Sequence, residues 1–202
     1  AGGTEVATCA WPTTVFLDGG SGDDCTGVLI HPEVVLTAAH CVDTARPSEV
    51  VFGESSTGSL TVGITECEVH ELYSWGDTNW DIAICRLERS VTEVTVVPLL
   101  MGCEADILTV SDQPVVAVGF GRTAEGDAGI KREIDLWIDT DRTLTSPRIA
   151  IGGAPGQSGC TGDFGGPTFV RLSDGTWRVM SIHDSALCGG AGITDTLVSD
   201  GY

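Results

Sequence analysis

The sequence predicts an all-β protein, and three observations support this prediction. Short runs rich in Val, Ile and Thr recur along the chain, separated by Gly, Asp, Ser and Pro, as in a barrel or sandwich. The chain contains 27 glycines, which favour tight turns. Stretches with the 3.6-residue period of an amphipathic helix are scarce.

The strand pattern divides the chain into two halves. We expect strands at 14–18, 27–30, 49–53, 60–69, 81–87, 114–121, 133–139, 148–152, 167–172 and 176–182. The pattern is interrupted near residue 100, so residues 1–100 and 101–202 are each expected to form one barrel. The polar stretch 122–133 is expected to be an exposed loop. Because active sites favour clefts between domains, a site should draw on both halves.

The charge balance is strongly acidic. The chain has 29 acidic and 10 basic residues, a net charge of -19, and Lys131 is its single lysine. Nucleic acid and anionic membranes are therefore poor partners, because both need clustered positive charge. A solubilising surface is the commonest reason for such a balance; a saline habitat or a basic partner are the alternatives. With no leader before Ala1 and no apolar run of membrane-spanning length, we expect a mature, soluble form without a membrane span.

The eight cysteines predict disulfides. The chain has no C-x-x-C pair and no Cys/His spacing suited to zinc, so neither a metal nor a cofactor is predicted. Disulfides persist in oxidising compartments, which indicates a secreted, periplasmic or cell-surface protein. His31, His70 and His183 are not at ligand spacing, and we expect them at the surface or in turns.

Three segments carry residues with catalytic chemistry: LTAAHC at 36–41, DIAICRL at 81–87 and GCTGDFGGP at 159–167. Acyl transfer by a serine needs a hydroxyl, an imidazole that takes its proton and a carboxylate that orients the imidazole. His40 and Asp81 supply the last two groups, but no hydroxyl stands at 164. In sequence and order, the segments resemble the histidine, aspartate and serine motifs of the trypsin and chymotrypsin family of serine endopeptidases.

The resemblance covers nearly the whole chain, from residues 2–17 to the last pocket strand at 192–197. It implies two six-stranded antiparallel β-barrels with a cleft between them, the chymotrypsin-like fold. The first barrel would carry His40 as general base and Asp81 as its orienting carboxylate. The second would carry the pocket and the GDFGGP loop, in which Gly162 is a backbone donor of the oxyanion hole.

Phe164 stands where the family has its nucleophilic serine. A phenyl ring has no labile proton and no lone pair, so His40 cannot activate it, and its bulk obstructs the pocket. We therefore expect peptidase activity to be lost. The hydroxyls of Ser158, Thr161 and Ser181 match the pocket wall or floor and are not expected to replace the nucleophile. A natural replacement is favoured over an engineered one, because inactivation by design usually introduces a small residue.

The pocket residues also follow from the resemblance. Ser158 matches the pocket floor and Gly159 and Gly192 match its walls, which suits an apolar or small group. Ser181 resembles the hydroxyl that supports the triad aspartate. The chain reads Ser-Ile-His at 181–183 where the family has Ser-Trp-Gly, which weakens the case for ordinary peptide binding. The hydrogen bond between His40 and Asp81 has two interpretations, and both stay open: it satisfies a buried carboxylate that needs a partner, or it keeps a functional role.

Asp163 matches the carboxylate that pairs with the family's new amino terminus. The chain begins Ala1-Gly2-Gly3, without the branched apolar residue of that terminus, so either the pocket is loose or another group meets Asp163. The loop at Glu54 matches the family's calcium loop but lacks further carboxylates, so no calcium is expected.

The resemblance also implies a disulfide pattern. It pairs Cys25 with Cys41 and Cys160 with Cys188; Cys67 and Cys85 lie on consecutive strands and could bridge them, which leaves Cys9 with Cys103.

The functional hypothesis is a secreted, catalytically inactive homologue that binds a protein partner or assembles with itself. One alternative is a working serine endopeptidase whose nucleophile at 164 was altered in this particular sequence. The other is a purely structural subunit of an extracellular assembly.

Overall fold

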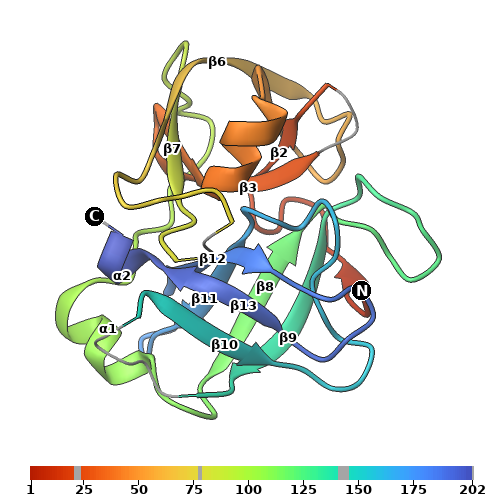
Figure 1. The fold of residues 1–202 in the computed structure, drawn as a ribbon. Helices are drawn as coiled ribbons and strands as arrows, with labels where there is room; N and C mark the ends of the chain where they lie inside the picture. The colour runs from red at the N-terminus through yellow and green to blue at the C-terminus, as the bar shows by residue number, and fades with distance from the viewer. Residues whose placement is uncertain (21–23, 77–78, 141–145, 202) are drawn as a thin grey trace.

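The first half of the chain closes into a six-stranded barrel. The computed structural model describes residues 1–20, 24–76, 79–140 and 146–201, and its two barrels lie one above the other (Figure 1). Antiparallel pairing runs in the closed order β2-β3-β4-β7-β6-β5. The strands are β2 (Thr14–Asp18), β3 (Cys25–His31), β4 (Val34–Thr37), β5 (Glu49–Phe52), β6 (Leu60–Val69) and β7 (Ala83–Leu87).

The second half forms the other barrel. Its strands follow the order β9-β10-β13-β12-β11-β8, and β8 also pairs with β9, which closes the ring. They are β8 (Pro114–Gly119), β9 (Arg132–Ile138), β10 (Arg148–Gly152), β11 (Pro167–Arg171), β12 (Trp177–Ser185) and β13 (Ile193–Leu197). A short strand from the first half, β1 (Thr4–Glu5), is added at the edge of β9. The predicted pair of six-stranded antiparallel barrels is confirmed.

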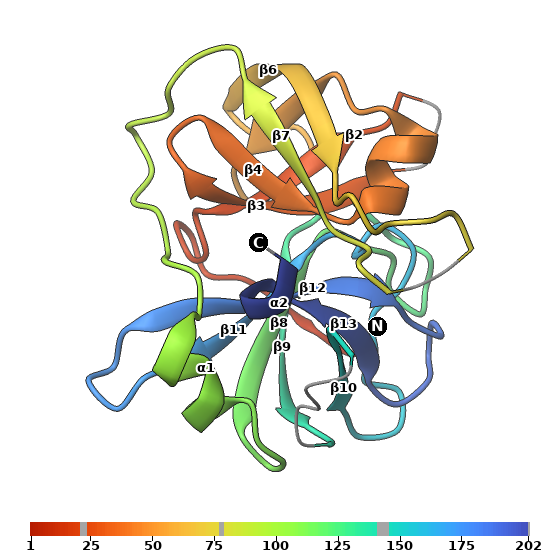
Figure 2. The same cartoon turned by 60° about the vertical axis from the view of Figure 1, so that its left-hand side comes forward.

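Helices are few and short. They are η1 (Cys41–Ala45), a π-helix, and the α-helices α1 (Gly102–Leu108) and α2 (Val198–Gly201). Figure 2 shows α1 at the end of the long connection between the barrels. Within the part of the chain that the structure describes, no helix combines the length and the apolar character needed to cross a bilayer.

The two barrels share a continuous apolar core. The cluster that fills the first barrel, with Val28 and Leu36 at 0% exposure, extends to Phe169 and Ile182 of the second. Trp11, in the segment between β1 and β2, stacks on Phe169 with ring centroids 4.5 Å apart. A separate cluster of buried residues fills the second barrel. Burial across the interface therefore fixes the barrels against each other.

Three disulfides form as the resemblance implies. They join Cys25 to Cys41, Cys67 to Cys85 and Cys160 to Cys188.

The fourth expected bond, between Cys9 and Cys103, is absent: both are exposed free thiols. The amide of Cys9 donates to Oε1 of Glu54 in the first barrel at 2.6 Å. Cys103 lies on α1, which the ion pair between Glu104 and Arg178 attaches to β12. The two cysteines are thus attached to different parts of the fold. The expectation of a disulfide between Cys9 and Cys103 was wrong.

Lys131 corrects the expectation that residues 122–133 are all exposed. It is only 1% exposed, and its Nζ donates to the carbonyl of Trp11 at 2.9 Å. The ammonium lies 5.4 Å from the ring centroid of Phe120. Burial lowers the pKa of Lys131 to about 8, although the carboxylate of Glu54 opposes this shift.

We predict that this buried lysine makes the stability of the protein rise between pH 8 and pH 10. The unfolded chain holds the proton of Lys131 up to its ordinary pKa of 10.5, whereas the folded chain releases it near pH 8. Stability rises with pH wherever the unfolded state binds more protons. The free energy of unfolding of the parent minus that of Lys131→Met should increase by up to about 3 kcal/mol over this range.

Urea titrations at several pH values measure this difference. Both proteins should carry Cys9→Ser and Cys103→Ser, because free thiolates attack disulfides above pH 8. A difference that stays constant with pH would contradict the buried position of the ammonium.

Candidate active site

The pairing of β4 with β7 brings His40 and Asp81 together. Thr37, the last residue of β4, pairs with Ala83, the first residue of β7. His40 and Asp81 therefore lie just beyond two neighbouring strand ends. Nδ1 of His40 lies 2.6 Å from Oδ2 of Asp81, and the amide of His40 donates to Oδ1 at 2.9 Å. The side chain of Asp81 is 4% exposed and that of His40 is 25% exposed. The carboxylate therefore orients an imidazole that solvent can reach.

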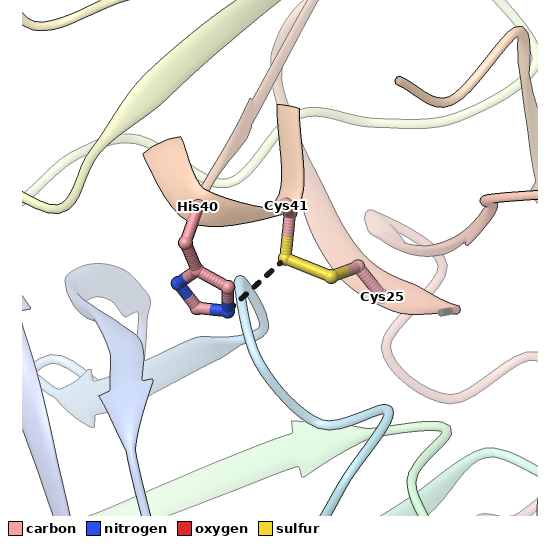
Figure 3. A group of neighbouring side chains, drawn as sticks. All are labelled: Cys25, His40 and Cys41. Atoms are coloured by element: carbon pink, nitrogen blue, oxygen red, sulfur yellow. Dashed lines mark hydrogen bonds between the residues drawn. A yellow bond between two sulfur atoms is a disulfide. The ribbon is translucent and has the colours of Figure 1, made fainter. Parts of the chain in front are cut away.

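The imidazole lies beside a disulfide (Figure 3). Nε2 of His40 is 3.7 Å from Sγ of Cys41, which is bonded to Cys25. One ligand atom from each of these three residues lies within 4.8 Å of the others, a spacing that could hold a metal ion. Metal binding needs thiolates, however, and both sulfur atoms are already joined to each other.

Thr26 on β3 holds the loop that contains residue 164. Its amide donates to the carbonyl of Phe164 at 2.9 Å, and its Oγ1 donates to the carbonyl of Gly162 at 2.7 Å. Oγ1 also accepts the amide of Phe120 at 3.1 Å. Because Thr26 is fully buried, these bonds are made without competition from water. The backbone of this loop is thus fixed by the first barrel.

Phe164 fills the space next to the imidazole. Its ring meets that of His40 edge to face, with centroids 5.4 Å apart and planes inclined by 74°. The ring also packs against the apolar core shared by the barrels. Gly162 has a φ of 96°, a conformation that favours glycine. In the described part of the chain, no acceptor takes the amide hydrogen of Gly162 or of Phe164.

Three of the predicted pocket residues, Ser158, Gly159 and Gly192, lie close together. Ser158 forms a bridge with Gly192, and its Oγ accepts the amide of Gly189 at 3.0 Å. A methyl group added to Gly159 would lie 2.8 Å from Cγ2 of Ile193 and 3.0 Å from Cβ of Ala186. A side chain at position 159 would therefore require these neighbours to shift.

The remaining predicted pocket residues lie elsewhere. Thr161 is exposed beside the pocket. Ser181 does not support Asp81: its Oγ donates to Oδ2 of Asp195 at 2.7 Å inside the second barrel. The physical reason is the pairing of β12 with β13, which places the fully buried Ser181 beside Asp195 rather than Asp81.

His183 belongs to the same buried network and is not a surface or turn residue. It is 3% exposed, and its Nε2 lies 3.0 Å from Oγ1 of Thr168, which donates to Oδ2 of Asp195 at 2.6 Å. Its Nδ1 lies 3.2 Å from the carbonyl of Asp163. Oδ1 of Asp195 has no partner among the described residues. Sequence reasoning missed this network, because four separate segments contribute to it.

Asp163 is met by backbone amides. Gly121 donates to its Oδ1 at 2.8 Å and Cys160 donates to its Oδ2 at 2.9 Å. A Cβ atom at Gly119 or Gly121 would overlap this carboxylate, so glycine is needed at both positions. Burial raises the pKa of Asp163, whereas the charge of His183 and the two amides lower it.

The buried carboxylate of Asp184 forms an ion pair with Arg148, whose side chain is 28% exposed. The guanidinium donates to both carboxylate oxygens at 2.9 and 3.0 Å, and the side chain of Asp184 is 0% exposed. Burial raises the pKa of Asp184 to about 6 although hydrogen bonds from Arg148 and Ser185 lower it. The pair fixes the end of β12, which leads into Ala186.

The family can now be assigned. A family model described as Trypsin matches residues 1–183, which is most of the chain. The chain belongs to the trypsin family. It is 30% identical to chymotrypsin-C of Bos taurus over 203 residues, covering 90% of this chain and 76% of that protein. It is 31% identical to chymotrypsin-like elastase family member 1 of Macaca fascicularis over 209 residues, with the same coverage. Brachyurin of Leptuca pugilator is 32% identical over 206 residues, 93% of this chain and 88% of that protein.

We predict that Arg148→Met destabilises this trypsin-family chain by roughly 3 to 5 kcal/mol, because it leaves a buried carboxylate unpaired. Adding Asp184→Leu to the same chain should recover most of the loss, since no buried charge then remains. Arg86→Met is a matched control: it breaks the exposed pair with Glu66 and should cost less than about 1 kcal/mol. Urea unfolding measures all three. Equal losses of stability for Arg148→Met and Arg86→Met would contradict the interpretation that Arg148 neutralises a buried carboxylate.

Proposed function

We propose that this member of the trypsin family is catalytically inactive and acts as a secreted protein-binding module. The observation that carries the proposal is the phenyl ring of Phe164 beside the imidazole of His40. The geometry that would activate a hydroxyl is retained, with 2.6 Å between His40 and Asp81. The group to be activated is absent, so acyl transfer by the family's route has no nucleophile.

Without a nucleophile, the chain would keep a rigid two-barrel scaffold whose surfaces can bind other proteins, a role that the fold alone does not specify.

Secretion is part of the proposal. The three disulfides fit an oxidising compartment outside the cytoplasm. The similar proteins, chymotrypsin-C and the elastases, are serine endopeptidases by name and family, and what they cleave is not carried over to this chain.

Phe164→Ser tests the loss of the nucleophile. We expect the parent chain to be silent toward a panel of peptide and activated ester substrates. The serine variant should hydrolyse small activated esters at least about 100-fold faster than the parent, because base, carboxylate and amide donors are in place. Phe164→Ala is the control: it removes the ring without adding a nucleophile and should stay silent.

The decisive contrary result concerns the parent. Turnover by the parent chain that His40→Ala abolishes would show a working active site and overturn the proposal.

A further inference from the structure

The end of β6 and its connection to β7 carry exposed apolar side chains. Val69, Leu72 and Trp75 are 37%, 56% and 66% exposed, and all lie within seven residues of sequence. An exposed indole in a segment with other exposed apolar side chains is typical of an interaction surface, and tryptophan often contributes much of the binding energy there. We call Glu68, Val69, Glu71, Leu72 and Trp75 the β6–β7 patch.

The same segment is acidic throughout. Residues 66–81 contain neither lysine nor arginine, and their acidic members are Glu66, Glu68, Glu71, Asp77 and Asp81. Glu66 pairs with Arg86, and Asp81 is bound to His40. Glu68 and Glu71 are exposed, and within the described chain they make no ion pair.

Tyr73 follows Leu72 in the sequence, and its surroundings also carry negative charge. Burial is the main cause that raises its pKa to about 12, and the charges of Asp81 and Asp43, which lie outside the patch, add to the shift. In the sequence the patch is followed closely by Asp81, the residue that binds His40.

We propose that the β6–β7 patch is the docking surface for a positively charged partner protein, one that offers lysine or arginine side chains beside an apolar recess for Trp75. Charge complementarity favours a basic partner protein over a second copy of this chain as the occupant of the patch. Two copies of a chain with net charge -19 repel each other, whereas a basic partner is steered toward Glu68 and Glu71. The proposal rests on the proposed function, because it names the partner class of a binding module.

A synthetic peptide serves as the probe. A capped peptide of about twelve alternating lysine and leucine residues offers both chemistries of such a partner. A second peptide with serine in place of leucine offers the charge alone. Calorimetric titrations at about 50 mM and about 300 mM salt separate screened charge attraction from apolar contact.

Matched variants separate the patch from general charge attraction. Trp75→Ser removes the indole, and Ile107→Ser is its control, because Ile107 is 68% exposed on α1. Glu68→Lys with Glu71→Lys reverses the patch charge. Its control is the double change of two exposed acidic residues elsewhere, Glu125→Lys with Asp127→Lys, which alters the net charge equally.

We expect the lysine-leucine peptide to bind the parent and to lose at least about tenfold in affinity in both patch variants, with both controls within about twofold of the parent. Equal weakening by the patch and control charge reversals would overturn the proposal, as would equal binding of the lysine-serine peptide. Self-association of the parent that Trp75→Ser abolishes would also overturn it, because the occupant would then be a second copy. None of these results depends on the activity of Phe164→Ser, so the two proposals fail separately.

Discussion

Thr26 is the residue on which the geometry of the site depends. From β3 of the first barrel it binds the carbonyls of Gly162 and Phe164 and the amide of Phe120, all in the second barrel. A bond from Oγ1 of Thr37 to the Thr26 carbonyl, 2.9 Å long, completes the arrangement. The backbone of the GDFGGP loop is therefore set by contacts that do not involve the side chain at 164. This explains how a phenyl ring can replace a hydroxyl while the surrounding framework keeps its shape.

The proposed inactivity rests on one chemical feature, because the ring of Phe164 has no atom that His40 can deprotonate. A chain without that reaction would act through its surface, and the β6–β7 patch is the part of the surface for which we propose a partner.

The sequence predicted what depends on local pattern. The alternation of β-branched residues gave the bounds of β2, β6 and β10 as they occur, and the motifs located His40 and Asp81. It could not predict features that depend on how strands continue and cross. Ser181 was misplaced because its hydroxyl meets Asp195 of β13 inside the second barrel, a contact between strands that no local pattern shows. Burial of Lys131, likewise, follows from the path of the amino-terminal segment.

The central claim is that no activated serine remains in this protein. The most direct measurement is the intact mass of the folded chain after exposure to an excess of an organophosphonate that reacts with activated serine hydroxyls. The account predicts an unchanged mass for the parent chain, because the base at His40 has no hydroxyl within reach. A stoichiometric adduct on the parent, lost in His40→Ala, would contradict it.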